Sequence, residues 1–155
     1  MEIVERATGQ KKPVSITRVV KGDLKSLTKQ RYFFKWKDLY ETTELYKLTI
    51  DGDDDILGVM ALQDIPEDRR FEIKLLASSR ENVGTTKEYE HIAGCMIAYA
   101  CGLANRAYAD LACVSLLPKT ELKKHYIQRY NMLEGGAQVF LEAAPLNNMI
   151  KKYLL

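Results

Sequence analysis

The sequence predicts an α+β fold: a central mixed, mostly antiparallel sheet, with one parallel βαβ crossover, flanked by helices. The first observation is the order in residues 71–117, where an apolar run, a polar loop, a long amphipathic segment and a second apolar run follow one another. Two strands joined by a helix are almost always parallel, with a right-handed crossover. The second observation is a pair of apolar runs around the acidic turn Asp51–Asp55, which indicates an antiparallel hairpin.

Length and composition are those of an ordinary globular chain. The 155 residues suit one domain over residues 1–155, in which we allow for flexibility in residues 1–12, and 46% of the residues are apolar and 28% charged. The net charge of +2 does not by itself argue for a nucleic acid or a membrane. Three cysteines without paired spacing, two histidines and the absence of an apolar signal core favour a cytoplasmic protein without a metal site.

The first third of the chain predicts a strand, a short helix and an aromatic segment. Residues 13–20 are β-branched and read as the strand, and Asp23 can cap a helix over residues 24–31. The stretch 31–37 mixes basic and aromatic side chains, which suits either single-stranded nucleic acid or a buried lid beside the sheet. With the overall charge near neutral, we favour the lid or core interpretation.

The strands of the hairpin are expected over residues 44–50 and 56–65, and the next strand over residues 71–78. The turn Asp51–Asp55 alternates carboxylates, as a calcium loop does. The twelfth position from Asp51 is Leu62 rather than Glu, so a solvated hairpin tip is the better interpretation.

The crossover helix is expected over residues 87–106, where apolar residues recur at helical spacing. Thr85 and Glu88 fit a capping box at its start, and a second parallel strand is expected over residues 111–117. A helix capped by Thr120 then runs to Tyr130, with a left-handed stop at Asn131. A last strand over residues 137–142 and a helix over residues 147–155 complete the chain.

This order, with the details of residues 71–132, resembles the GNAT superfamily of N-acetyltransferases, in a divergent branch. The strand 71–78 looks like the family's fourth strand, and 111–117 like the fifth, which splays away to open the cofactor cleft. The start of the crossover helix looks like the phosphate-binding helix, and the segment His125 to Met132 like the family's Tyr-containing helix with its Gly-Phe stop. The resemblance covers roughly residues 13–142 and is weakest before Glu44.

The resemblance implies that acetyl-CoA (CoA) binds at the crossover. The family's phosphate motif is Arg/Gln-x-x-Gly-x-Gly/Ala, and this chain offers Glu88, His91 and Ala93 at those positions. His91 would crowd a phosphate if it took the middle position with positive φ, whereas glycine would not. The loop 78–84 and nearby cations can replace the motif. The candidate cofactor-binding residues are Leu75, Leu76, Ala77, Ser78, Arg80, Asn82, Gly84, Lys87, Ala93 and Gly94.

Two side chains are candidates for the chemistry. Tyr126 matches the family's tyrosine that protonates the departing thiolate, and it suits equally a core position on the stripe from Leu122 to Tyr130. Glu72 could accept the proton of an amine, although a cross-strand charge pair explains it better. Backbone N–H groups of residues 76–78 could polarise the thioester carbonyl.

The leading hypothesis is an N-acetyltransferase that passes an acetyl group from acetyl-CoA directly to a small-molecule or peptide amine acceptor. The alternative is a catalytically degenerate GNAT-like domain that acts as a protein-interaction module. A weaker third hypothesis is a nucleic-acid-binding domain that uses the aromatic and basic stretch 31–37. We expect no membrane partner, and a homodimer through residues 137–155 is a further expectation from the family.

Overall fold

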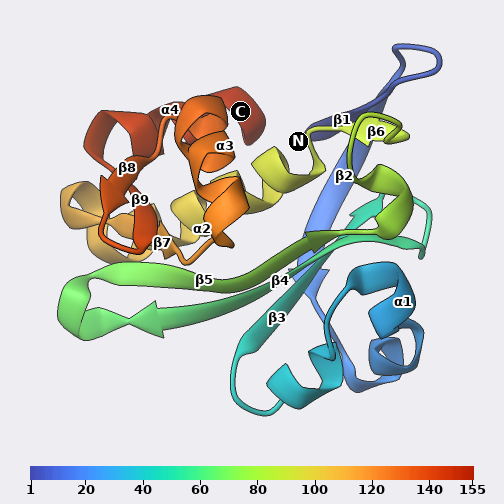
Figure 1. The fold of residues 1–155 in the computed structure, drawn as a ribbon, viewed down its shortest axis with the longest axis horizontal. Helices are drawn as coiled ribbons and strands as arrows, with labels where there is room; N and C mark the ends of the chain where they lie inside the picture. The colour runs from blue at the N-terminus through green and yellow to red at the C-terminus, as the bar shows by residue number, and fades with distance from the viewer. The chain divides into compact units, whose positions relative to one another are not determined.

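A computed structural model describes residues 1–155 (Figure 1). The chain divides into two compact units, residues 1–61 with 76–96, and residues 62–75 with 97–155. The boundary passes through strands β4 (Ile56–Ile65) and β5 (Arg70–Ser78) and through helix α2 (Ile92–Tyr108). The two units are described separately below, and the single domain over residues 1–155 stays a prediction.

The strands form one mixed nine-stranded sheet with the order β6-β1-β2-β3-β4-β5-β7-β9-β8. The parallel pair is β5 with β7, as the crossover predicted, and this confirms the expected fold class. Besides β4 and β5, the strands are β1 (Glu2–Glu5), β2 (Lys11–Arg18), β3 (Glu44–Ile50), β6 (Tyr89–Glu90), β7 (Cys113–Leu116), β8 (Leu133–Gly135) and β9 (Gln138–Glu142).

Helices lie between these strands and after the last of them. Besides α2, the α-helices are α1 (Lys29–Tyr32), α3 (Thr120–Tyr130) and α4 (Ala143–Tyr153). Short 3-10 turns occur at η1 (Lys21–Ser26), η2 (Trp36–Leu39), η3 (Pro66–Asp68), η4 (Arg80–Asn82) and η5 (Ala109–Leu111). None of the helices combines the length and the apolar character that crossing a membrane requires.

The first unit begins with a strand where the sequence suggested a flexible stretch. In β1, Ile3 is fully buried, and the strand pairs antiparallel with β2 on one side and with β6 on the other. Val4 lies opposite Glu90 in the β1–β6 pair (Figure 1). The sequence missed this strand because only four residues form it, and its second partner lies far along the chain.

The helix predicted over residues 24–31 is wrong, since η1 and α1 replace it and are separated at residues 27–28. Thr28 caps α1 by accepting a hydrogen bond from the Arg31 N–H. Tyr32 and Trp36 are 1% and 0% exposed, and the Tyr32 hydroxyl donates to the Ile56 carbonyl. The core interpretation is therefore confirmed for these two rings, which leaves them unable to stack on nucleic-acid bases.

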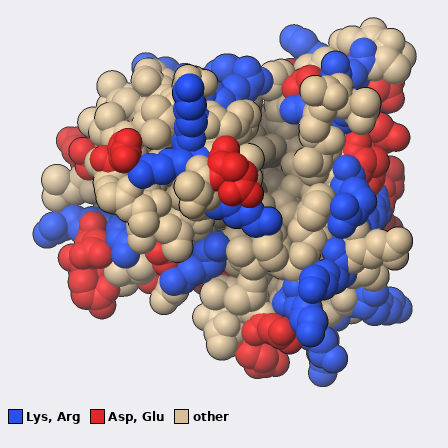
Figure 2. All heavy atoms as spheres, viewed as in Figure 1, with Lys and Arg blue, Asp and Glu red and all other residues tan.

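Charges of both signs are mixed over the molecular face in Figure 2. In the aromatic and basic stretch, Arg31 is bound to the carboxylates of Asp55 and Glu81. Its charge is thus compensated within the first unit. Lys35 and Lys37 of the stretch are exposed, but the buried rings of Tyr32 and Trp36 cannot stack on bases, which disfavours binding of single strands here.

Asp23 and Lys47 form an ion pair, 2.7 Å apart, in the first unit, and Asp23 also accepts a hydrogen bond from the Val20 N–H. The predicted helix cap by Asp23 is thus replaced by a bond back to residue 20. Burial alone would raise the pKa of Asp23, but the hydrogen bonds from Lys47 and Val20 outweigh it and lower the pKa below its usual 3.8.

Asp23→Asn should therefore lower the free energy of unfolding by about 1 kcal/mol at pH 7. Because the folded pKa is lowered, the stabilisation is complete above the ordinary aspartate pKa and disappears as the pH falls through the folded value. Urea unfolding at pH 7 and near pH 2 measures this effect. A difference between wild type and variant that is equally large at both pH values would contradict the ion-pair explanation.

In the second unit, the apolar faces of three strands form the core. Val114 on β7 lies between Phe71 of β5 and Leu141 of β9, and Val114 and Leu141 are fully buried. The strand expected over 111–117 is shorter than predicted because η5 occupies its start. Helix α4 begins at Ala143, four residues before the predicted start, and buries Leu146, Met149 and Tyr153.

The start of α3 also differs from the prediction. Lys119 rather than Thr120 is the N-cap, and no side chain forms a capping hydrogen bond there. The end agrees with the prediction, since Asn131 follows the helix with φ of 59°, in the left-handed region. Asparagine tolerates this conformation better than most residues, which explains the stop.

Candidate functional site

Strand β5 extends beyond its parallel partner. The pairing of β5 with β7 runs from Arg70–Cys113 to Ile73–Leu116, and β5 then continues to Ser78. On the β7 side, the last residues of β5 are therefore not paired with that strand. Among the predicted cofactor-binding residues here, Leu75, Leu76 and Ser78 are half-buried and Ala77 is buried. Backbone groups at such an unpaired edge can bind an extended ligand.

The loop after β5 is held by its own polar groups. The Ser79 N–H donates to the Leu57 carbonyl at 2.9 Å, which joins the loop to β4. The Asn82 amide donates to Ser79 Oγ at 3.0 Å, and its oxygen accepts from the Tyr89 N–H at 2.9 Å. Asn82 is buried, so its side chain shapes the loop and fixes the start of β6. Gly84 follows with φ of +82°, in an open part of the loop.

Arg80 contacts the α1 segment. Its Nε donates to the Gln30 carbonyl at 2.6 Å, and its guanidinium lies 4.5 Å from the centre of the Phe33 ring. Next to it, Glu81 is bound by Arg31. Burial acts to raise the pKa of Glu81, but the hydrogen bonds to its carboxylate and the charge of Arg31 together outweigh burial and lower the pKa. These contacts anchor η4 to α1.

The helix predicted to begin at Lys87 begins instead at Ile92, and the capping box at Thr85 and Glu88 is wrong. Residues 85–88 stay outside the helix, and the carbonyls of the first and the last of them are bonded to Arg6. The Arg6 guanidinium donates a hydrogen bond to the Thr85 carbonyl, and the Arg6 backbone N–H donates one to the Glu88 carbonyl. Pairing with a distant strand has thus displaced a local helix signal.

His91 directly precedes the first residue of α2 and has a φ of +82°. This is the positive φ that glycine favours, at the position where the resemblance expects glycine. The first helical hydrogen bond runs from the Cys95 N–H to the His91 carbonyl, so the N–H groups of Ile92, Ala93 and Gly94 have no acceptor within the helix. Such amides are suited to an anion, and the turn therefore fits a phosphate group.

The carboxylate beside this turn is compensated by cations. Glu90 lies 3.4 Å from Arg6 Nε and 3.5 Å from Lys87 Nζ. Glu88 is exposed to solvent. The negative charge expected at the phosphate motif is therefore partly neutralised, which favours the fit to a phosphate.

His91→Gly should be tolerated, whereas His91→Val should lower the free energy of unfolding by about 1–3 kcal/mol. Glycine adopts positive φ without steric cost, but a β-branched residue there clashes with its own backbone. Thermal denaturation of the two variants and the wild type measures the difference. Equal melting temperatures for the two variants would contradict this conformation of residue 91.

Gly58 is a positioning residue that the sequence analysis missed. A Cβ built on it would lie 2.6 Å from Met96 Sδ and 2.8 Å from Ile92 Cγ2. The first turns of α2 therefore approach β4 as closely as a glycine permits. An isolated glycine inside an apolar strand signals such a close approach, so this position could have been recognised from sequence.

In the second unit, Glu72 belongs to a polar cluster on β5. It is 7% exposed, lies 2.5 Å from Lys74 Nζ and 3.6 Å from Arg70, and accepts from Gln138 at 3.3 Å. Arg70 also donates to Ser115 Oγ at 2.6 Å, on the paired strand β7. These contacts support the interpretation of Glu72 as a member of a charge pair.

Tyr126 is half-buried on α3, with its ring 6.0 Å from that of Tyr130 and 5.6 Å from that of His125. Burial raises the pKa of Tyr126 above its usual 10, so the phenol keeps its proton at physiological pH. A protonated phenol can donate to a developing anion. Tyr130 is more deeply buried, and burial raises its pKa further.

The cysteines do not supply a nucleophile at neutral pH. Burial raises the pKa of Cys95 and of Cys113 to about 11, and that of Cys101 to about 12. The thiolate is the reactive form, and these values keep all three thiols protonated.

The sequence matches no protein-family model and no curated protein. Solved structures do match. A chimera of spermidine N-acetyltransferase SpeG from Vibrio cholerae and hSSAT has a TM-score of 0.64 and 14% identity, over 87% of this chain and 98% of that chain. AtaTR bound with AcCoA has a TM-score of 0.62 and 14% identity, over 88% and 97%. A GNAT family acetyltransferase from Brucella melitensis in complex with acetyl-CoA has a TM-score of 0.57 and 15% identity, over 84% and 88%.

Identities this low relate folds rather than activities. The similar folds of these structures agree with the parallel β5–β7 pair and with the mixed sheet around it. The chain has the fold of the GNAT acetyltransferases, as the resemblance of residues 71–132 predicted.

Proposed function

We propose that this protein is an N-acetyltransferase that uses acetyl-CoA and passes the acetyl group directly to an amine. The observation that carries the proposal is the extension of β5 beyond Ile73, where its pairing with β7 ends. In the GNAT resemblance this stretch pairs with the pantetheine arm. The His91 turn supports the same role, because it supplies amides suited to a phosphate.

The residues that would hold acetyl-CoA lie at the end of β5, in the segment between β5 and α2, and in the first turn of α2. Backbone groups of residues 75–78 would bind the pantetheine arm, and the amides of Ala93 and Gly94 the pyrophosphate. Lys87, Arg80, Asn82 and Gly84 complete the proposed set. Since Asn82 and Arg80 hold the loop through the contacts described above, their part is to shape it.

Acetyl-CoA supplies an activated acetyl thioester when bound. The N–H groups of Leu76 and Ala77 would polarise the thioester carbonyl, as an oxyanion hole does. Tyr126 Oη would give its proton to the departing sulfur, a role that rests on the resemblance and on the protonated state of the phenol. The C–N bond forms as the C–S bond breaks. Glu72 stays the candidate acceptor for the amine's proton, directly or through water.

The acceptor is proposed as a small-molecule or peptide amine. Among the similar structures, one is of a spermidine N-acetyltransferase chimera, and another is of AtaT complexed with acetyl-methionyl-tRNA. The first name specifies a polyamine as the substrate, and the second an acetylated amino acid on tRNA. A panel of polyamines, amino-acid amides and peptides, assayed for release of free CoA thiol, would define the acceptor class.

Isothermal titration with acetyl-CoA and with CoA tests the proposal. We expect binding in the micromolar range for both ligands. The absence of heat and of any thermal shift at millimolar ligand would overturn the proposed enzyme. That result would favour the alternative, a GNAT-like interaction module. The alternative is motivated by Glu88 and His91, which stand where the phosphate motif has Arg or Gln and Gly. Sedimentation velocity on the same sample would test the expected homodimer.

A further inference from the structure

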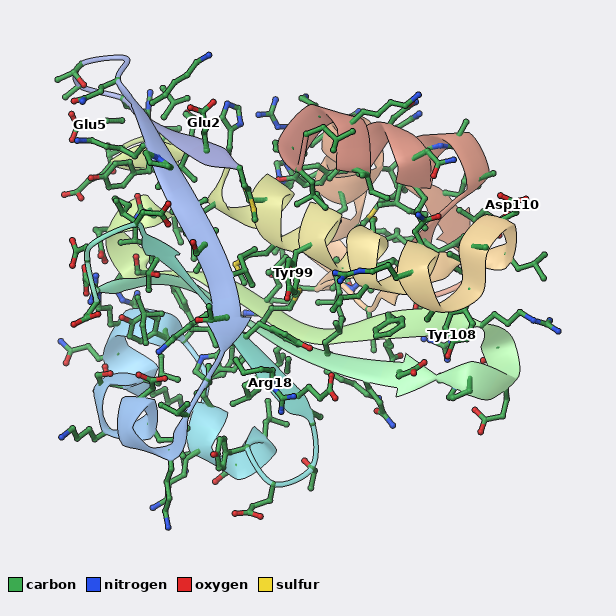
Figure 3. The ribbon with its side chains drawn as sticks, turned by 180° about the vertical axis from the view of Figure 1, so that it is seen from behind. Glu2, Glu5, Arg18, Tyr99, Tyr108 and Asp110 are labelled. Atoms are coloured by element: carbon green, nitrogen blue, oxygen red, sulfur yellow. The ribbon has the colours of Figure 1, made fainter.

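The amino-terminal strand β1 is bonded to the segment that precedes α2. Val4 lies opposite Glu90 and Glu5 opposite Tyr89 in the β1–β6 pair. Figure 3 shows Glu2 and Glu5 along β1, with Glu2 at the end of the strand nearer to α2. The Cys95 thiol, in the first turn of α2, also donates to the Glu2 carbonyl at 3.4 Å. Strand β1 thus contacts the proposed phosphate turn on both sides of His91.

Arg6, directly after β1, makes three contacts with this segment. Its backbone N–H donates to the Glu88 carbonyl at 2.8 Å, and its guanidinium donates to the Thr85 carbonyl. Its Nε lies 3.4 Å from the Glu90 carboxylate. One residue therefore fixes positions 85, 88 and 90, which are the approach to the His91 turn.

The ion pair has an electrostatic consequence as well. Glu90 immediately precedes His91, and a carboxylate there would repel a phosphate bound to the amides of residues 92–94. Arg6 and Lys87 compensate this charge. Without the Arg6 side chain, the segment would lose a cation and two of the three contacts at the same time, while the backbone bond to the Glu88 carbonyl would remain.

We propose that Arg6 is a positioning residue for the phosphate groups of CoA, acting through Glu90 and the carbonyls of residues 85 and 88. This inference rests on the proposed function. In this proposal, Arg6 shapes the phosphate site from the segment after β1 without itself binding the phosphate. The effect of Arg6 should therefore depend on whether the ligand carries phosphate.

The test compares four proteins with three ligands. The variants are Arg6→Ala, the double variant Arg6→Ala/Glu90→Gln, and the control Arg18→Ala. Arg18, the last residue of β2, forms an exposed ion pair with Glu44, 3.7 Å apart, in the same unit (Figure 3). The ligands are CoA, dephospho-CoA and pantetheine, and binding is measured by titration calorimetry. Circular dichroism establishes that each variant is folded.

Arg6→Ala should weaken CoA and dephospho-CoA by roughly tenfold and leave pantetheine unchanged, since pantetheine carries no pyrophosphate. Removing the uncompensated carboxylate in the double variant should restore most of the affinity for CoA. Arg18→Ala should bind all three ligands as the wild type does. A folded Arg6→Ala protein that binds CoA normally, or that loses pantetheine to the same extent, would overturn the inference. A wild type that binds no CoA would instead overturn the proposed function.

Discussion

Tyr126→Phe should lower kcat for acetyl transfer by about 100-fold and leave KM for acetyl-CoA nearly unchanged. The substitution keeps the ring, which packs 6.0 Å from Tyr130, and removes only the hydroxyl that would protonate the leaving sulfur. Steady-state kinetics with the best acceptor from the amine panel measures both constants. A parallel loss in kcat and melting temperature would instead favour a core role for this side chain.

Tyr130→Phe is the matched control for this experiment. Tyr130 lies one helical turn further along α3 and is buried, so its loss should affect stability more than kcat. The pH dependence gives a second check. Because burial raises the pKa of Tyr126 above 10, the acid stays protonated below that value. Loss of kcat in the wild type through a tyrosine-dependent step between pH 7 and 9 would contradict this assignment.

Gly58→Val should lower the free energy of unfolding by about 3 kcal/mol, the upper end of the usual cost of overpacking. Even the first carbon of the new side chain would lie under 3.0 Å from Met96 and from Ile92. Where the protein still folds, the start of α2 must move away from β4, and CoA affinity should fall with it. Urea denaturation and calorimetric titration measure the two effects.

Gly22→Ala provides the comparison for Gly58. No atom lies within 4 Å of a Cβ built on Gly22, and its φ is not in the positive region. This substitution should be neutral or slightly stabilising, because it restricts the unfolded chain without a clash. If both glycine substitutions cost the same free energy, the close approach of α2 to β4 is not what makes Gly58 necessary.

The parts that the sequence predicted well are those with a strong local pattern. The β3 and β4 strands have the expected bounds, because an acidic turn separates two apolar runs. The parallel pairing of β5 and β7 followed from the strand–helix–strand order. The stop at Asn131 could also be predicted, since few residues accept a left-handed conformation.

The parts that sequence did not predict depend on contacts between distant residues. The Thr85 and Glu88 signal favoured a helix from Lys87, but Tyr89 and Glu90 pair with β1 as strand β6, so the helix begins only at Ile92. Arg6 was unremarkable in sequence, because its partners at Thr85 and Glu90 become neighbours only in the folded chain. Similarly, nothing local indicates that Asn82 bonds to Tyr89.

The pairing of β1 with β6 also has a consequence for the order of folding. The bond between Arg6 and Thr85 joins residues 79 positions apart, so the chain must close a long loop before this bond can form. Contacts of such separation form slowly compared with local hairpins and helices. During synthesis, β1 can pair early with β2, but its pairing with β6 can form only after the middle of the chain has been made. We expect the turn at His91 to reach its final conformation only after α2 and the β3–β4 hairpin have formed.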